Sequence, residues 1–78
     1  MTVNDLKPGE RGRILAIGGT GALRQRLLDM GFTPNTPLLV QKIAPLGDPV
    51  ELFLRGYALT LRRSEAAQIT VVREEGAL

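Results

Sequence analysis

Turn-forming residues recur at short intervals along the whole chain, and this spacing limits what the chain can fold into. Nine glycines and five prolines are distributed over 78 residues, and they leave only short stretches between them. Short aliphatic and β-branched stretches with a turn about every eight to twelve residues are typical of small all-β barrels. Such stretches are predicted as strands over residues 12–17, 38–43, 50–54, 57–61 and 69–72. We therefore predict one mainly β domain over residues 1–78, a small SH3-like barrel of about five strands.

Between the first two predicted strands, the spacing of apolar residues changes from that of a strand to that of a helix. Residues 22–30 place apolar side chains at i, i+4 and i+7 and polar side chains on the other face, which is typical of an amphipathic helix. We expect Thr20 to be its N-cap and Gly31 to adopt the left-handed conformation that ends it. A single helical turn capped by Ser64 is predicted before the last strand, and a polar tail from Glu74 onward.

Two connections can be predicted from the chemistry of their residues. Pro34 and Asn35 occupy the second and third positions of a four-residue turn, which suits type II because Asn tolerates a positive φ. Asp48 is the one acid in the loop over residues 44–49 and has no second carboxylate nearby in sequence. We expect it to cap this loop as an Asx turn rather than to bind a metal. The positions assigned to structural turns are Gly31, Pro34, Asn35, Pro45, Gly47, Asp48 and Pro49.

The chain contains neither cysteine nor histidine. Disulfides, thiolate metal sites, the usual general base and the commonest transition-metal ligand are therefore excluded. The glycine-rich segment over residues 18–21 lies where phosphate-binding loops occur, but the Lys-Ser/Thr pair of such a loop does not follow it. Asp29 and Glu65 have no base or nucleophile beside them in sequence. We predict a protein that is not an enzyme and has no catalytic residue, metal site or cofactor.

We expect this chain to act by binding a partner through outward-facing side chains. Strand alternation turns Leu39, Phe53 and Val72 outward. These residues either join into an apolar patch, for a partner or for self-association, or stay scattered and covered. Arg24 and Arg55 are added as candidate partner contacts.

The charge of the chain is nearly balanced, with a formal net charge of +2. This balance permits nucleic-acid binding without arguing for it, and aromatic side chains for base stacking are almost absent. We expect no nucleic-acid partner, although a small nucleic-acid-binding barrel stays an alternative. The uninterrupted apolar runs are far shorter than the ~20 residues of a membrane span. The first residues also lack the charged and apolar regions of a signal peptide.

Three blocks, taken together and in order, resemble one known family. They are RLLDMGFTP over residues 26–34, IAPLGDP over residues 43–49 and YALTLRRSEA over residues 57–66. The lead-in LKPGERG over residues 6–12 fits as well. The sequence is similar to the FeoA family across about residues 5–73. Asn35 departs from the family pattern, which usually has Gly there, but Asn can supply the positive φ that the turn needs.

The resemblance implies a cytoplasmic SH3-like barrel with one inserted helix. It also implies an accessory role beside the ferrous iron transporter FeoB, a membrane protein with a cytoplasmic GTP-binding domain, so that contact with the membrane is indirect. Similar domains stand at the end of some metal-dependent repressors, so a domain of such a regulator is an alternative. Met1 and the short tail favour a stand-alone chain. Without His or Cys, the chain offers iron only carboxylates and backbone oxygens, so we expect no tight, selective Fe²⁺ binding by it alone.

Overall fold

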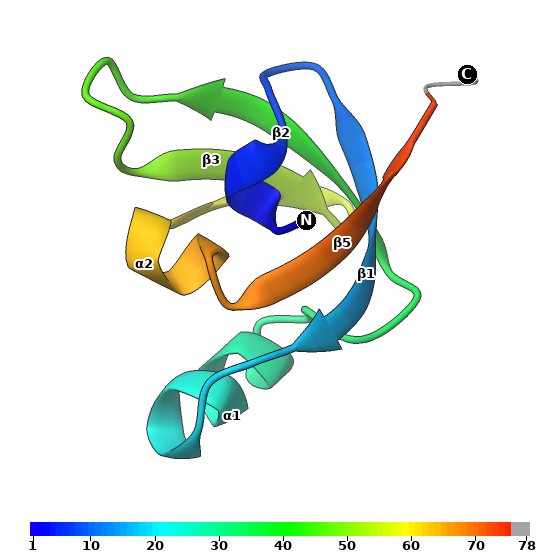
Figure 1. The fold of residues 1–78 in the computed structure, drawn as a ribbon, viewed down its shortest axis with the longest axis vertical. Coiled ribbons are helices and arrows are strands. Elements are labelled where there is room, and N and C mark those ends of the chain that lie inside the picture. The colour runs from blue at the N-terminus through cyan, green and yellow to red at the C-terminus, as the bar shows by residue number, and fades with distance from the viewer. Residues whose placement is uncertain (76–78) are drawn as a thin grey trace.

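The computed structural model describes residues 1–75, which form a single curled antiparallel sheet with short helices around it (Figure 1). The order of the five strands in the sheet is β4-β3-β2-β1-β5. Their bounds are β1 Arg11–Ile17, β2 Pro37–Ile43, β3 Val50–Leu54, β4 Tyr57–Leu61 and β5 Ile69–Glu74. The helices are the 3₁₀ turn η1 Val3–Asp5, α1 Gly21–Asp29 and α2 Arg63–Ala66. The predicted fold class is confirmed, with one helix after the first strand and a helical turn before the last.

Two register shifts help the sheet to curl around its core. One lies between Ile14 and Ala16 where β1 pairs with β5, and the other between Val40 and Lys42 where β2 pairs with β3. Irregularities of this kind bend a strand and increase its twist. The inner face of the curled sheet holds a core that is aliphatic except for Phe32, which is fully buried.

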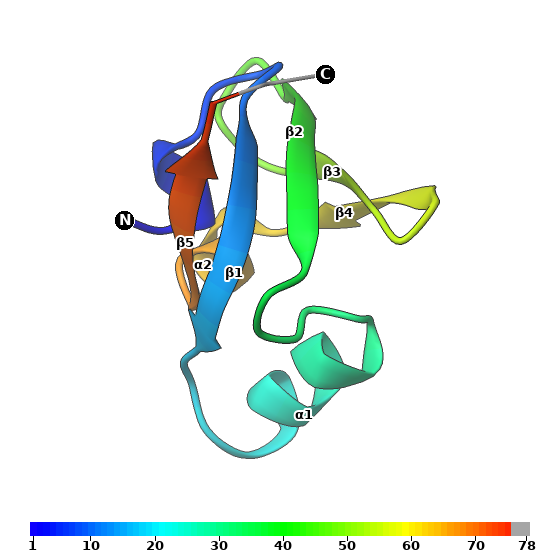
Figure 2. The same ribbon diagram turned by 90° about the vertical axis from the view of Figure 1, so that its right-hand side faces the viewer.

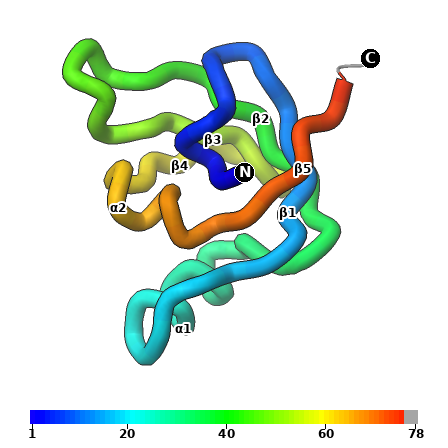
Figure 3. Tube along the Cα trace, in the orientation of Figure 1, coloured from blue at the N-terminus to red at the C-terminus, as the bar shows by residue number. Residues whose placement is uncertain are grey.

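The two short helices fill the opening between the edge strands β4 and β5. α2 contacts β4 and η1, and η1 contacts β5. Figures 2 and 3 show both helices on the inner side of the sheet and α1 at one end of the barrel. The outer edge of β5 is also paired with the N-terminal segment, through a bridge between Thr2 and Thr70 and a 2.9 Å hydrogen bond from the Val71 amide to the Met1 carbonyl. The N-terminal segment thus covers the start of the β5 edge.

The end of α1 is closed by a Schellman motif. Gly31 has a φ of +104°, and its N–H donates to the Leu28 carbonyl at 3.0 Å. The Phe32 N–H donates to the Leu27 carbonyl at 3.1 Å, and both of these side chains are fully buried. The prediction that Gly31 ends the helix is confirmed, because the left-handed residue and both hydrogen bonds of this motif are present, and Leu27 and Phe32 belong to the same buried cluster. Thr20 does occupy the N-cap position, but its side chain makes no capping hydrogen bond.

Three local predictions were wrong. The N-cap of α2 is Arg62 rather than Ser64, because the Glu65 carboxylate turns back to accept a hydrogen bond from the Arg62 N–H at 2.8 Å. Asp48 does not cap its own loop, since its carboxylate accepts a hydrogen bond from the Arg63 N–H at 3.0 Å. Glu74 belongs to β5 rather than to a tail, because it pairs with Arg11 of β1, and its carboxylate lies 2.7 Å from Nε of Arg13. Glu75 follows the strand and is exposed, and the rest of the predicted tail, residues 76–78, lies outside the described residues.

Candidate interaction surface

The outward face of the sheet carries an apolar pair at its centre. Leu39 of β2 lies directly opposite Phe53 of β3, so the two side chains are cross-strand neighbours. Leu39 is half-buried, whereas Phe53 is 39% exposed. The pair lines a shallow hollow of about 300 Å³, with Pro37 beside it and Arg11, Arg55 and Glu74 on its charged rim. Two of the predicted partner contacts are therefore adjacent in the fold.

Arg55 has a structural role that the sequence did not indicate. Its backbone is left-handed, with a φ of +51°, in the tight turn between β3 and β4. The guanidinium reaches across to the turn after α1, where Nε donates to the Gly31 carbonyl at 3.1 Å. Nη2 donates to Oγ1 of Thr33 at 2.8 Å and to Oγ1 of Thr36 at 3.1 Å. Arg55 thus ties the β3–β4 turn to the end of α1.

The turn that Arg55 contacts has the geometry predicted for it. Asn35 has a φ of +72°, and the Thr36 N–H donates to the Thr33 carbonyl at 3.2 Å, which closes the four-residue turn. The Asn35 N–H also donates to the Ile14 carbonyl of β1 at 2.7 Å. Because this turn leads directly into β2, it fixes where Leu39 lies on the sheet.

Val72 and Arg24 lie outside the hollow. Val72 is 46% exposed on β5, opposite Arg13 of β1. Arg11 and Arg13 lie on the strand between Val72 and Leu39, so the three predicted apolar residues do not form one continuous patch. Arg24 is exposed on α1 and makes no side-chain hydrogen bond or ion pair within residues 1–75.

The loop between β2 and β3 presents another exposed apolar side chain. Leu46 is 97% exposed at its tip. The loop is closed by its own backbone: the Gly47 N–H donates to the Ala44 carbonyl at 2.7 Å, and the Ala44 N–H donates to the Pro49 carbonyl at 3.0 Å. Gly47 has a φ of +88°. Leu46 was not singled out from the sequence, although an apolar residue at the tip of so tight a loop has little chance of reaching the core.

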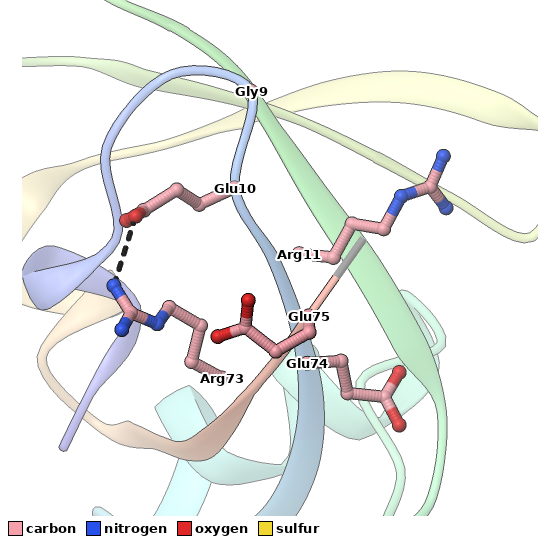
Figure 4. Close-up of a pocket in the computed structure, with 6 residues that line it drawn as sticks. All are labelled: Gly9, Glu10, Arg11, Arg73, Glu74 and Glu75. Carbon is pink, nitrogen blue, oxygen red and sulfur yellow. Dashed lines mark hydrogen bonds and ion pairs between the residues drawn. The ribbon is translucent and has the colours of Figure 1, made fainter. Parts of the chain in front are cut away.

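A second hollow, of about 230 Å³, lies where the start of β1 meets the end of β5 (Figure 4). Glu10 accepts hydrogen bonds from the Lys7 N–H at 2.8 Å and from Arg73 Nη1 at 3.0 Å. The hydrogen bond from the Lys7 backbone and, after it, the charge of Arg73 lower the pKa of Glu10 below its ordinary value of 4.5. Figure 4 shows Arg11 extending away from this ion pair. Its guanidinium makes no hydrogen bond or ion pair within residues 1–75.

The acidic side chains of the described part of the chain are dispersed or paired with arginines. Among residues 1–75, no three His, Cys, Asp or Glu side chains gather closely enough to hold a metal ion. Glu65, the most buried carboxylate, is ion-paired with Arg26 at 2.6 Å and accepts the Arg62 N–H. No helix in this part of the chain has the length and apolar character needed to cross a membrane. The features that stand out on the surface are an apolar pair and a neighbouring cation.

A family model described as the FeoA domain matches residues 1–73. A fusion protein from Porphyromonas gingivalis, described as Fe(2+) transport protein A/Fe(2+) transporter FeoB, is 38% identical over 71 residues. That match covers 91% of this chain and 8% of the fusion protein, so the chain spans less than a tenth of the relative's length.

Two solved structures are similar over nearly the whole chain. The FeoA protein from Chlorobium tepidum superposes with a TM-score of 0.88 at 40% identity, covering 100% of this chain and 74% of that one. The zinc complex of FeoA from Stenotrophomonas maltophilia, described as a prokaryotic SH3 domain protein, has a TM-score of 0.84 at 23% identity, covering 99% of each chain. The second likeness bears on the fold alone. The predicted SH3-like architecture is confirmed.

Proposed function

The chain belongs to the FeoA family, which is linked to ferrous iron transport, and from this premise we propose that it is a non-enzymatic accessory protein that binds the cytoplasmic GTPase region of a FeoB-type transporter. The compartment of action is then the cytoplasm, and contact with the membrane runs through the transporter. A relative that joins an FeoA part and a FeoB part in one polypeptide supports the proposal, because fusion keeps two partners at high effective concentration.

The observation that carries the proposal is the exposed apolar pair on the sheet. Phe53 is the largest apolar side chain on the outward face, and Leu39 lies directly beside it. Aromatic residues, Phe among them, are enriched in the cores of protein interfaces, and the residues that dominate binding energy cluster near the centre of an interface. We propose Leu39 and Phe53 as the contacts that anchor the transporter. Arg24 and Val72 remain predicted contacts at the margins, and Arg55 holds the rim in place.

Calorimetric titration of the chain with the isolated cytoplasmic region of the cognate transporter tests the proposal, with and without guanine nucleotide. We expect a dissociation constant of tens of micromolar or tighter, as is typical of a small transient interface. Phe53→Ser should weaken binding by about tenfold or more, because truncating a central anchor removes most of its contact. Leu46→Ser is the matched control, since it removes an exposed apolar side chain from the loop tip. Absence of binding by the unmodified chain would refute the proposal.

A further inference from the structure

The surroundings of the Leu39–Phe53 pair carry an unbalanced positive charge. Glu74 lies on the rim, but its Oε2 is 2.7 Å from Nε of Arg13 and its Oε1 is 3.4 Å from Nη2. Its charge is thereby neutralised. Arg11, on the same rim, has no such partner within residues 1–75 and is half-buried against the sheet. A carboxylate brought to this hollow would pair with Arg11 without displacing an existing partner.

We propose that the hollow receives the apolar face of an amphipathic helix from the transporter's cytoplasmic region, and that an Asp or Glu of that helix pairs with Arg11. This inference rests on the proposed function and specifies its partner segment. It assigns Arg11 a role that sequence reasoning did not give it. The helix binds through two apolar anchors over the Leu39–Phe53 pair and one charge contact.

The spacing of the three residues sets the pattern of the partner. Phe53 opposes Leu39, and Leu39 opposes Arg11, so they form one row across three adjacent strands. Neighbouring strands lie about 4.8 Å apart, which puts the ends of the row about 10 Å apart. A helix rises about 1.5 Å per residue, so residues i and i+4 are about 6 Å apart and i and i+7 about 10.5 Å apart. Apolar residues at i and i+4 and an acid at i+7 therefore match the row.

The position of the row within the sheet favours a helix over an added strand. Addition of a strand requires a free edge with unpaired backbone groups. Phe53, Leu39 and Arg11 lie on β3, β2 and β1, which are the three inner strands of the sheet. A partner therefore meets side chains on the face of the sheet rather than backbone at its edge. A helix is the element that presents three side chains along one straight stripe at this spacing.

Arg55 is the other cation on the rim, but its side chain links the β3–β4 turn to the turn after α1. Its Nε and Nη2 already donate to the Gly31 carbonyl and to the hydroxyls of Thr33 and Thr36. A partner carboxylate would have to compete with these three hydrogen bonds. At Arg11 no side-chain hydrogen bond or ion pair within residues 1–75 has to be displaced.

Charge reversal separates this proposal from the proposed function. The full chain, carrying either Arg11→Glu or Arg62→Glu, is titrated with the isolated cytoplasmic region of the transporter at low and at moderate salt. Arg62 is exposed and lies outside the hollow. Both substitutions make the same change in charge, and neither arginine has a side-chain partner within residues 1–75. We expect Arg11→Glu to weaken binding about tenfold or more and to reduce its salt dependence, while Arg62→Glu changes affinity by less than about threefold.

Each result of these titrations either supports or refutes the contact between Arg11 and the partner helix. Equal effects of the two substitutions would overturn the Arg11 contact while leaving the proposed function intact, and failure of the unmodified chain to bind would overturn both. In the transporter, an Asp or Glu→Arg scan should find one acid whose reversal restores binding to the Arg11→Glu chain. That acid should follow two apolar residues at the i, i+4, i+7 spacing. No restoring reversal, or one outside this pattern, would refute the helix. Two-dimensional NMR spectra confirm that each variant is folded.

Discussion

Gly31 meets two requirements at one backbone position. Its φ of +104° lies in a region that side chains with a Cβ rarely adopt. A Cβ at this position would also lie 2.9 Å from Cδ and 3.1 Å from Nε of Arg55. Gly31 therefore both ends α1 and leaves room for the Arg55 side chain that donates to its carbonyl.

Replacing Gly31 with Ala should destabilise the fold more than the same change at Gly56. Gly56 has a φ of +88°, but nothing lies within 4 Å of the position that its Cβ would take. Gly56→Ala therefore measures backbone strain alone, which we expect to cost about 1 kcal/mol. Gly31→Ala should cost about 1 kcal/mol more, because Arg55 has to move. Urea denaturation of both variants compares the two free energies of unfolding, and equal losses would show that Arg55 gives way freely.

Glu10 should make the stability of the protein depend on pH in the acid range. Its pKa in the folded state is lowered, mainly by the hydrogen bond from the Lys7 backbone, so the folded protein holds its proton less tightly than the unfolded chain. The stabilisation is present above its ordinary pKa of 4.5 and is lost as the pH falls through the lowered value. Glu10→Gln should lose less stability than the unmodified chain between about pH 6 and about pH 3. Parallel stability curves, measured by urea denaturation across this range, would contradict the assignment.

The element α2 has only four residues and depends on groups supplied from outside it. The Asp48 carboxylate, from the loop between β2 and β3, accepts the Arg63 N–H at 3.0 Å, and the Asn4 side-chain amide donates to the Arg63 carbonyl at 2.9 Å. Helices this short do not form without such support. The stability of α2 is thus coupled to two segments far from it in sequence.

Asp48→Ala should cost about 0.5–2 kcal/mol, the usual range for loss of a side-chain acceptor at a helix N-terminus. Asp48→Asn keeps an acceptor oxygen and should restore most of the loss. The comparison is made by thermal and urea denaturation. If Asn and Ala were equally destabilising, the charge of Asp48, rather than its hydrogen bond to Arg63, would be what matters.

At the scale of elements, the sequence predicted what short-range chemistry determines. Gly31 and Asn35 were identified because a helix end and a type II turn each require positive φ at one position. The strands followed from turn spacing. The contacts of Arg55 with the end of α1, of Asp48 with α2 and of Glu74 with Arg13 were not predicted, because their partners are 15 to 61 residues away. No local pattern encodes which distant backbone group a side chain meets.

The same reasoning explains what was predicted of the candidate site. Strand alternation identified Leu39 and Phe53 as outward-facing, but their adjacency depends on the register between β2 and β3. Register also separates Val72 from them, by placing it opposite Arg13. Arg11 was not predicted, because its lack of a partner depends on the ion pair that Glu74 forms with Arg13. The sequence thus indicates which side chains face outward, but not which of them are neighbours on the sheet.

For the molecule as a whole, one aliphatic core joins every element, so we predict a single cooperative domain. Phe32, at the end of α1, is buried in the same cluster as Leu52 of β3 and Val71 of β5. Urea unfolding followed by far-UV circular dichroism should coincide with unfolding followed by the fluorescence of Tyr57, the chain's one tyrosine. Tyr57 is a suitable probe because its hydroxyl donates to the Met30 carbonyl at 3.4 Å, across the α1 junction. Separated transitions would mean that α1 unfolds independently.

The covered part of the β5 edge also bears on how the protein behaves when it is concentrated. An open sheet edge is a template for pairing with another chain, which can lead to aggregation. Here the N-terminal residues pair with β5 through Thr2 and Thr70. Deleting the first two residues would expose the amide of Val71, which now donates to the Met1 carbonyl. The first two residues of the chain therefore protect this stretch of β5 from pairing with another molecule.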